Sequence, residues 1–352
     1  MQTVLVLFGG VSPEHAVSLV SAEAVLRNLN KENRRVLPVG ITLSGKWMLF
    51  GGDDYADIAA DKWEDNPANR TAFLSPERGA GLCIFGENGV ETVPVDVIFP
   101  VLHGENGEDG SIQGLFQLSG IPYAGCHVCA AAASMDKSVT KLIAATTGVR
   151  QAEWLTLCRA DFRRDADAMC IKITEKFAFP VFIKPCSTGS SVGVSKVKTA
   201  AELLPALENA FKYDSKILAE EFINGREIEV AVLGNEEPKA ATAGEIDAGA
   251  EFYDYETKYV TSTSQAYIPA RISSELNAQV REWAVKVYSA LGCAGLSRVD
   301  FFVTRDTNEI VFNEINTLPG FTPISMYPKM WAAEGVPFAE LLDRVIALAL
   351  EG

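Results

Sequence analysis

The chain has 352 residues, of which 48% are hydrophobic and 22% are charged, and its formal net charge is -15. This is the composition of a globular protein with a substantial core, and the length predicts two or three domains. The acidic balance argues against a nucleic-acid partner, because binding to phosphates requires a basic face.

The apolar segments and the cysteines indicate the cellular compartment of the protein. No apolar run approaches the ~18 residues that suggest a membrane span, and the short stretch Val4–Phe8 lacks the basic leader of a signal peptide. The seven cysteines are scattered and odd in number, as expected of reduced thiols. Cys126 and Cys129 have the spacing of half a zinc site, but no second half follows. We therefore expect a cytoplasmic protein with no membrane partner.

The chain opens with a strand, a turn and a helix. Residues 3–8 read as a buried strand, and a glycine turn leads from it into an apolar-periodic helix over 16–29. Ser12 is expected to cap this helix, with Pro13 at its first position. The turn, Gly9–Ser12, does not match the Gly-x-Gly-x-x-Gly fingerprint, which argues against a nicotinamide dehydrogenase.

A second strand and helix complete the first predicted domain. The strand over 95–101 leads through a glycine- and acid-rich loop, residues 105–110, to a helix that begins near Ser111. Strands that alternate with helices indicate a mainly parallel sheet. We assign residues 1–125 to an N-terminal, Rossmann-like α/β domain.

Shorter strands then indicate a change to α+β structure. An alanine-rich helix is predicted over 130–147. It is followed by three short strands and a helix, over 154–158, 178–184, 192–197 and 199–213. We assign residues 126–220 to a small central domain.

The last predicted domain covers residues 221–352. Its expected elements are a strand, a long polar stretch, a helix and two further strands, over 228–233, 248–264, 273–291, 296–303 and 309–316, followed by C-terminal helices. The fold class is therefore α/β and α+β, in three domains.

The last two predicted strands place carboxylates together. Residues two apart in a strand share a face, so Arg298 lies beside Asp300, and Glu314 beside Asn316. The turn-like residues 305–308 would fold a hairpin that brings Asp300 and Glu314 within about one residue of register. Opposed carboxylates are destabilising unless a cation lies between them, and Asp, Glu and Asn oxygens suit Mg²⁺. A solvated strand face with ordinary charges is the alternative interpretation.

A candidate phosphate-binding loop follows the strand over 178–184. Its residues, Lys184–Gly193, are mostly small, so the backbone can wrap phosphate oxygens while Lys184 supplies positive charge. The loop is not a Walker A motif, because the lysine precedes the glycines. Taken alone, it is also consistent with an ordinary turn.

Together these segments resemble the D-alanyl-D-alanine ligase family of the ATP-grasp superfamily, over almost the whole chain. Six segments follow one another in the family's order: Phe8–His15, Leu102–Gly110, Ser134–Lys137, Lys184–Gly193, Phe252–Tyr259 and Asn313–Thr322. The resemblance implies a three-domain ATP-grasp architecture, with ATP held between the second and third domains. It also implies that ATP activates D-alanine as an acyl-phosphate, which a second D-alanine attacks to form a peptidoglycan precursor.

The resemblance implies roles for residues at the nucleotide site. The residues assigned to ATP are Lys137 and Lys184 at the phosphates, Glu220 and Glu227 at the adenosine, and Ser191 in the loop. The residues assigned to two magnesium ions, which manganese can replace, are Asp300, Glu314 and Asn316. The metal assignment agrees with the hairpin argument.

Further residues are assigned by resemblance to the first substrate. Glu14 accepts its ammonium group, and Ser190 and Tyr259 complete a hydrogen-bonded set with Glu14. Lys258 is a further catalytic residue. The polar stretch over 248–264 is the expected lid, which excludes water from the acyl-phosphate.

A last set concerns the oxyanion and the second substrate. Arg298 and the backbone N–H of Gly320 are expected to hold the developing oxyanion. His103, Ser325 and Met326 are expected near the second substrate. Each of these residues also has an ordinary structural interpretation, and it is their joint placement that favours a site.

The acceptor and the activity have alternatives. Ligases linked to glycopeptide resistance use D-serine or D-lactate in place of the second D-alanine, and the D-lactate-using relatives carry a histidine in the mobile loop. This chain has no histidine after His127, so an amine acceptor is expected. The apolar Met326 favours a methyl side chain over D-serine. A non-catalytic ATP-binding regulator is the alternative from another class, and the intact metal and lysine residues argue against it. Relatives are usually homodimers, and a homodimer is expected here.

Overall fold

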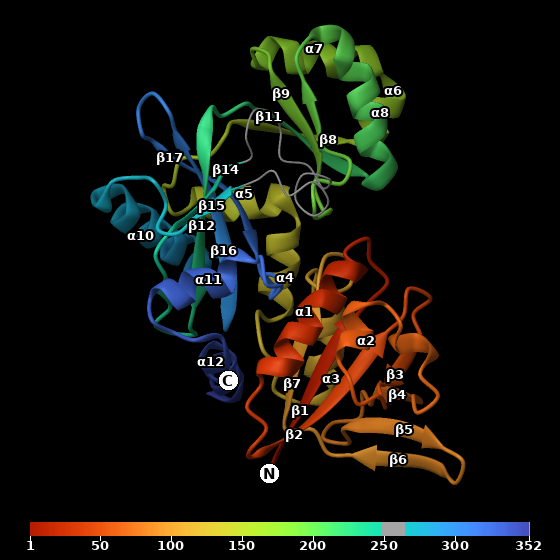
Figure 1. Cartoon of the computed structure of the whole chain (residues 1–352). Coiled ribbons are helices and arrows are strands. Elements are labelled where there is room, and N and C mark those ends of the chain that lie inside the picture. The colour runs from red at the N-terminus through yellow and green to blue at the C-terminus, as the bar shows by residue number, and fades with distance from the viewer. Residues whose placement is uncertain (248–264, 352) are drawn as a thin grey trace.

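The computed structural model describes residues 1–247 and 265–351, which form three β-sheets with their helices (Figure 1). The first sheet has seven strands in the order β6-β5-β4-β3-β2-β1-β7. Strands β2 (Arg34–Ile41), β1 (Gln2–Gly9) and β7 (Val97–Leu102) are parallel. The remaining four, β3 (Trp47–Leu49), β4 (Arg70–Leu74), β5 (Leu82–Gly86) and β6 (Gly89–Val93), extend the sheet in antiparallel pairs.

The parallel part confirms the expected α/β arrangement, and the antiparallel extension was not predicted. Successive strands joined by short connections pair antiparallel, whereas a parallel pair requires a crossover. Helices α1 (His15–Asn28) and α12 (Phe338–Glu351) lie on one face of the parallel strands, with Val4, Val6 and Phe8 beneath them. Helix α3 (Ser111–Ser119) covers the other face, over Leu5 and Leu7. The alternation along β1 follows from the two-residue period of a strand.

The expected cap of α1 is wrong. The helix begins at His15 and its N-cap residue is Glu14, which makes no side-chain cap hydrogen bond. Ser12 Oγ instead donates to the His103 carbonyl over 2.8 Å and accepts a hydrogen bond from the Glu14 N–H over 3.1 Å. The Ser12 hydroxyl, which the sequence predicts to be the cap of α1, is therefore hydrogen-bonded to the loop after β7.

The central sheet has four antiparallel strands in the order β10-β9-β11-β8. These are β10 (Ser195–Val197), β9 (Val181–Pro185), β11 (Lys216–Glu221) and β8 (Trp154–Cys158). Three helices lie beside this sheet: α6 (Arg159–Arg164), α7 (Ala166–Lys176) and α8 (Leu203–Tyr213). Helices α7 and α8 share an apolar cluster with the sheet. Strand β11 and helices α6 and α7 were not predicted.

The prediction of a single helix over 130–147 is wrong, because the helix is interrupted at Asp136. Helix α4 (Val128–Met135) ends there and α5 (Lys137–Ala145) begins. The Asp136 carboxylate accepts the N–H groups of the first turn of α5, so it acts as an N-cap. Both helices contribute buried residues to the core of the third sheet. The central domain expected over 126–220 therefore shares α4 and α5 with the part that follows it.

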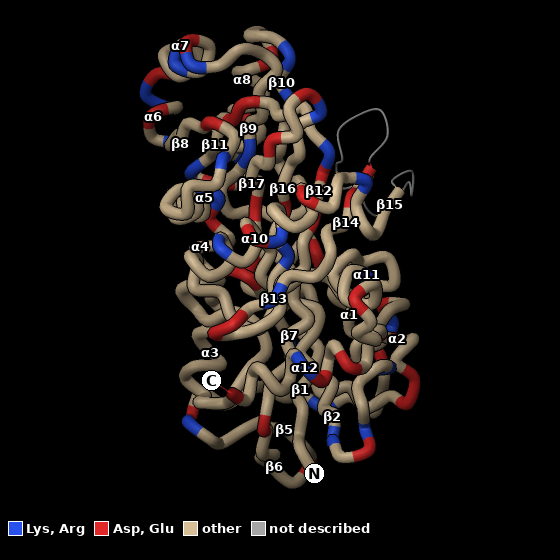
Figure 2. Tube along the Cα trace, turned by 90° about the vertical axis from the view of Figure 1, so that its left-hand side faces the viewer, with Lys and Arg blue, Asp and Glu red and all other residues tan. Residues whose placement is uncertain are grey.

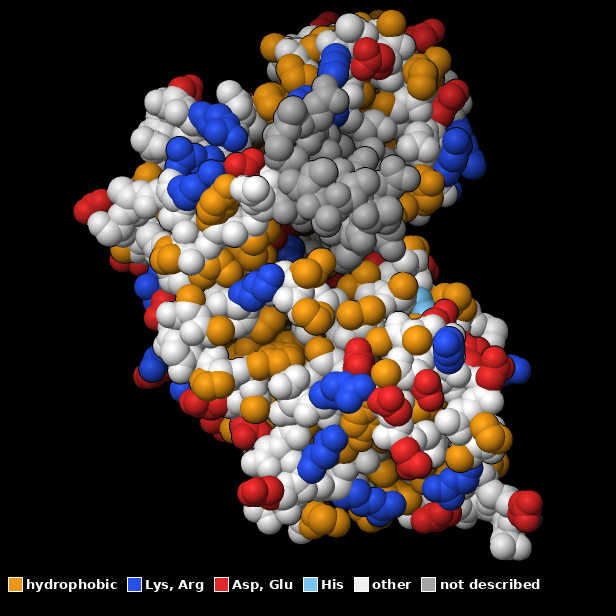
Figure 3. Space-filling model, viewed as in Figure 1, with side chains coloured by type: hydrophobic (Ala, Val, Ile, Leu, Met, Phe, Trp, Pro, Cys, Tyr) orange, Lys and Arg blue, Asp and Glu red, His pale blue; other side chains and the backbone are white. Residues whose placement is uncertain are grey.

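The third sheet has six strands, in the order β15-β14-β12-β16-β17, with β13 paired to β12. Their bounds are β12 (Gly225–Leu233), β13 (Lys239–Ala240), β14 (Gly244–Asp247), β15 (Gln265–Tyr267), β16 (Leu296–Thr304) and β17 (Ile310–Asn316). Helix α10 (Ser274–Ala290) covers one face, and α11 (Met326–Ala333) contacts β12 from the other. One apolar cluster continues from α11 through α12 into the first sheet, and Figure 3 shows hydrophobic side chains along this junction.

Charged residues of both signs occur together in all three parts of the chain (Figure 2). Among the helices that the structure describes, none combines the length and the apolar character needed to cross a bilayer. All seven cysteines are free thiols, as predicted.

Candidate functional site

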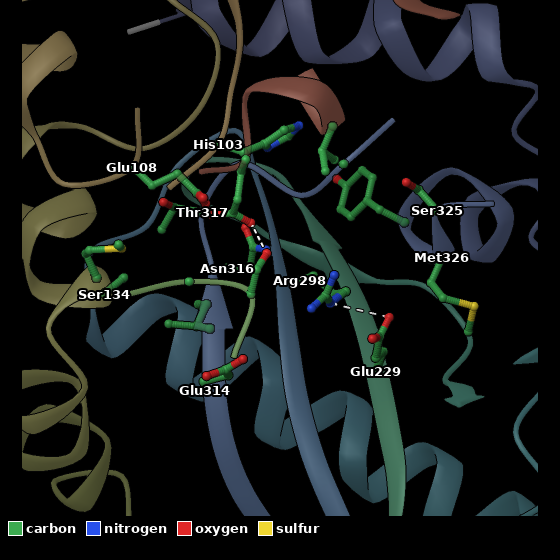
Figure 4. Close-up of a pocket in the computed structure, with 18 of the residues that line it drawn as sticks. His103, Glu108, Ser134, Glu229, Arg298, Glu314, Asn316, Thr317, Ser325 and Met326 are labelled. Atoms are coloured by element: carbon green, nitrogen blue, oxygen red, sulfur yellow. Dashed lines mark hydrogen bonds and ion pairs between the residues drawn. The ribbon is translucent and has the colours of Figure 1, made fainter. Parts of the chain in front are cut away.

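Two adjoining cavities lie where the three sheets meet. The first has a volume of about 180 Å³ and is lined by residues of the first sheet's loops, the loop after β9, and strands β12, β16 and β17 (Figure 4). The second, of about 430 Å³, lies between the central and third sheets. Lys137, Gly189 and Glu314 line both cavities. The arrangement is therefore one continuous site with two compartments.

Strands β16 and β17 bring the predicted metal-binding residues together. Asp300 pairs with Glu314 and Arg298 with Asn316, and a bulge follows Asp300. The hairpin prediction is confirmed, since the two carboxylates lie in direct register. Asn316 Oδ1 is buried and has no hydrogen-bond partner among residues 1–247 and 265–351.

This donor set fits a hard divalent cation. Mg²⁺ prefers oxygen ligands, and the unpartnered Asn316 Oδ1 lies beside the two carboxylates. Asp300 accepts hydrogen bonds from Arg298 Nε over 2.8 Å and Nη2 over 2.7 Å. Each of its oxygens still keeps a lone pair for a metal. The residues that can hold the cation are therefore Asp300, Glu314 and Asn316.

Arg298 is held between two carboxylates. In addition to Asp300, its Nε lies 3.3 Å from Glu229 Oε2 on the neighbouring strand β12, and Figure 4 shows the two side chains pointing toward each other. Burial alone would lower the pKa of Arg298, but Asp300 and Glu229 raise it well above its ordinary value. The guanidinium is thus a fixed positive charge facing the first cavity. Glu229 was not predicted.

The lysines of the second compartment are positioned by a buried carboxylate. Glu220 lies 2.6 Å from Lys184 Nζ and 2.7 Å from Lys141 Nζ. Burial would raise the pKa of Glu220, but the two lysines lower it to about 2. Lys141 is 2% exposed and was not predicted, because nothing in its local sequence marks it as buried. Both oxygens of Glu220, which was expected at the adenosine, are engaged by these lysines.

The remaining residues predicted to contact the nucleotide line the same compartment. Lys137 Nζ donates to the Thr188 carbonyl over 2.7 Å and lies 4.0 Å from Glu314 Oε2. Ser191 and Glu227 also line the compartment. Lys137 therefore links the loop after β9 to strand β17, which carries Glu314.

The loop after β9 contacts the first sheet through Glu14. Ser190 Oγ donates a hydrogen bond to Glu14 Oε1. Ser190 and Ser191 have φ angles of 49° and 59°, a conformation uncommon outside glycine. A Cβ atom at Gly189 would lie 2.5 Å from Glu14 Oε2, and one at Gly104 2.3 Å from it. A side chain at either position would therefore have to displace the Glu14 carboxylate, and at Gly104 the φ of 69° also favours glycine.

His103 and Glu108 lie on the far side of the first cavity. His103 Nδ1 lies 2.9 Å from the Leu318 carbonyl, so Nδ1 must be the donor. Burial lowers the pKa of His103. Glu108 accepts the Gly104 N–H over 2.8 Å and the Leu318 N–H over 2.9 Å. Burial, followed by the charge of Glu14, raises the pKa of Glu108 to about 8. The sequence marked Glu108 only as part of an acid-rich loop.

The turn after β17 completes the cavity. Gly320, Ser325 and Met326 all line it. The N–H of Gly320 donates no hydrogen bond within the described ranges. Ser325 Oγ lies 2.8 Å from Thr322 Oγ1, and Met326 is buried at the start of α11. Lys258, Tyr259 and the expected lid lie outside the described residues.

Comparisons with known proteins show which family this chain belongs to. Residues 3–126 match the family model described as the D-ala D-ala ligase N-terminus, and residues 143–347 match the model of the D-ala D-ala ligase C-terminus. The chain is 46% identical to a D-alanine--D-alanine ligase of Caldicellulosiruptor bescii, over 99% of this chain and 95% of that protein. It is 47% identical to one of Acetivibrio thermocellus, over 99% and 96%.

Solved structures are also similar. The VanG D-Ala:D-Ser ligase of Enterococcus faecalis has a TM-score of 0.90 and 40% identity, with 99% of each chain covered. The D-alanine-D-alanine ligase of Coxiella burnetii has a TM-score of 0.84 and 33% identity, with 99% of this chain and 94% of that chain covered.

Proposed function

Because the chain belongs to the D-alanine--D-alanine ligase family, we propose that it joins two D-alanine molecules at the expense of ATP, through a D-alanyl-phosphate intermediate. The observation that carries the proposal is the register of Asp300 with Glu314 beside Asn316 and Arg298. This register brings two carboxylates, an amide side chain and a fixed positive charge onto one strand face, between the two compartments, and this set supports the assignment of a cation site.

The second compartment binds ATP. Lys137 and Lys184 contact its phosphates, where their charges neutralise the transferring group. Glu227 and Ser191 contact other parts of the nucleotide. Glu220 acts as a positioning residue, since its carboxylate holds Lys184 on one side and Lys141 on the other. Two divalent cations, magnesium or manganese, would be held by Asp300, Glu314 and Asn316 and would supply further charge neutralisation at the phosphates.

The first compartment binds the two amino acids. Glu14 accepts the ammonium group of the first D-alanine, and Ser190 keeps the carboxylate of Glu14 in place. Tyr259 and Lys258 act from the lid over 248–264. Once the carboxylate of the first substrate has become an acyl-phosphate, Arg298 and the Gly320 N–H stabilise the oxyanion that forms on attack by the second amine. His103, Ser325 and Met326 contact the second D-alanine.

Buried Met326 favours a methyl side chain on the second substrate. Its Cε would lie 2.2 Å from a Cβ at Gly244, so Met326 is packed firmly against β14. D-serine is the alternative acceptor, because the similar Enterococcus faecalis structure is a D-Ala:D-Ser ligase. The expected order of use is D-alanine first, D-serine weakly and D-lactate negligibly.

The experiment measures phosphate release from ATP and separates the products by chromatography. With D-alanine alone, D-alanyl-D-alanine and ADP are expected. With D-alanine plus equimolar D-serine or D-lactate, the same dipeptide is expected as the main product. A mixed dipeptide or a depsipeptide as the main product would contradict the acceptor assignment, and ATP binding without phosphate release would favour a non-catalytic regulator.

We also propose a cytoplasmic homodimer and three domains, over 1–125, 126–220 and 221–352, except that helices α4 and α5 belong with the last domain. These two helices share the core of the third sheet, so they should remain with the C-terminal domain after cleavage. Limited proteolysis tests the division, and light scattering during gel filtration tests the dimer.

A further inference from the structure

A buried histidine near the start of α1 has one ring nitrogen without a partner. His15 is 5% exposed, and its Nδ1 lies 2.7 Å from the Gly10 carbonyl. A carbonyl only accepts hydrogen bonds, so Nδ1 is the donor, and Nε2 is the ring nitrogen left to offer a lone pair to a ligand. Nε2 is fully buried and has no hydrogen-bond partner among the described residues.

Two carboxylates lie next to this ring. One carboxylate oxygen of Asp61, one of Glu64 and one ring nitrogen of His15 all lie within 4.8 Å of one another. In the part of the chain that the structure describes, neither of these two carboxylates makes a hydrogen bond or an ion pair. Two close carboxylates facing a nitrogen lone pair repel one another unless a cation lies between them.

The position of the acidic segment is set by the core. Asp61 has a φ of 55° and follows α2 (Ala56–Ala59), which packs against α1. Between the two acids, Trp63 is fully buried and its ring lies 5.0 Å from that of Phe8. Trp63 therefore anchors this turn in the core, and the two carboxylates lie on either side of it in the chain.

We propose that His15 Nε2, Asp61 and Glu64 bind a zinc ion, with water completing the coordination. One imidazole nitrogen and two carboxylate oxygens suit Zn²⁺ better than Mg²⁺, which prefers oxygen ligands alone. The Nδ1–H hydrogen bond to a backbone carbonyl is the usual arrangement behind a metal-bound histidine. The carboxylates are exposed, so an ion can enter from solvent.

This site is separate from the cation site on β16 and β17, and we infer a structural role for it. His15 directly follows Glu14, so a bound ion would tie the start of α1 to the turn after α2. Zinc binding at this position would stabilise the segment that carries Glu14, the residue proposed to bind the first substrate.

The test measures Zn²⁺ binding to chelator-treated protein in excess Mg²⁺, which occupies the oxygen sites. The binding assay is competition with a chromogenic chelator, and the comparison is between the wild type and the double variant Asp61→Asn/Glu64→Gln. The wild type is expected to bind one more zinc per chain than the double variant, or to bind it at least tenfold more tightly. Asp65→Asn, an exposed neighbour outside the cluster, is the control and should match the wild type.

Two further readouts complete the test. Zn²⁺ is expected to raise the Tm of the wild type and of Asp65→Asn, but not that of the double variant, because an ion that binds only the folded chain stabilises it. Co²⁺ added to the wild type should give visible absorption bands that the double variant lacks. Equal stoichiometry, affinity and Tm response in all three proteins would place the ion at cysteines or catalytic carboxylates and overturn the proposal.

Discussion

Lys141 and Glu220 form a buried ion pair, in which 2.7 Å separates the lysine Nζ from Glu220 Oε1. The other oxygen of the same carboxylate lies 2.6 Å from Lys184 Nζ. Glu220 therefore fixes the lysine that we assign to the ATP phosphates, and Lys141 supplies the second charge that keeps Glu220 ionised in the interior.

Glu220→Gln is expected to lower the free energy of unfolding by about 3–5 kcal/mol, because it leaves two buried ammonium groups without a carboxylate. Urea unfolding measures this loss, and calorimetric titration should show weaker ATP binding. Lys141→Met, which leaves Glu220 with one partner, is the comparison and should retain more ATP affinity than Glu220→Gln. Wild-type stability and affinity in both variants would show that the ion pair does not position Lys184.

The same pair predicts a pH dependence of stability. The pKa of Glu220 is about 2 in the folded chain and 4.5 ordinarily, so its contribution is fully present above pH 4.5 and is lost as the pH falls toward 2. The stability difference between the wild type and Glu220→Gln should therefore be constant from pH 6 to pH 4.5 and should narrow from there to pH 3. A difference that stays constant down to pH 3 would contradict the assignment.

Asp300→Asn and Glu314→Gln are each expected to lower turnover by roughly a hundredfold or more, since each removes a cation ligand. The fold should be retained, because each substitution also relieves repulsion between opposed carboxylates. Phosphate release at increasing Mg²⁺ concentration is the measurement. Asp306→Asn, in the exposed turn of the same hairpin, should behave as the wild type. Near-normal turnover with an unchanged Mg²⁺ dependence in both ligand variants would exclude this site.

Glu14→Gln is expected to raise the KM for the first D-alanine roughly 10- to 100-fold, since a hydrogen bond to a charged group contributes about 1.5–3 kcal/mol. ATP affinity, measured separately, should change little. Glu23→Gln, on the outer part of α1, serves as the control. An equal loss for D-alanine and ATP would indicate a structural role at the contact with Ser190.

Glu108→Gln tests the buried carboxylate of the first cavity. In the wild type the pKa of Glu108 is about 8, against an ordinary 4.5, so the folded chain binds the extra proton and its stability falls as the pH rises from 4.5 to 8. Glutamine leaves one of the two backbone donors unpaired, at a cost of about 1–3 kcal/mol. The variant should therefore be less stable at pH 5, with a smaller difference at pH 8.5.

Thermal unfolding across this pH range is the measurement for Glu108→Gln. The exposed neighbour Glu105 provides the matched control, and Glu105→Gln should follow the wild-type curve. Parallel curves for the wild type and Glu108→Gln would mean that Glu108 is ionised throughout the range.

Short-range rules made the β16–β17 hairpin, the proposed cation site, predictable. Residues 298, 300, 314 and 316 lie on two strands joined by a turn, and a strand repeats its side-chain direction every two residues. Register across one hairpin is therefore readable from the chain itself. The order of the six conserved-looking segments added the remaining site residues by resemblance.

The sequence by itself determined which side chains share a strand face and where the turn of the β16–β17 hairpin lies, because these depend on neighbours a few residues apart. The order of motifs along the chain determined which family it resembles. The tertiary structure decided which charges are buried and what they contact. Lys141 forms an ion pair with Glu220, Glu108 accepts a hydrogen bond from the Leu318 N–H, and the Ser12 hydroxyl donates to the His103 carbonyl. Each of these partners lies about 80 or more residues away in the chain, and the cost of burying a charge or polar group is set by such distant partners rather than by local sequence.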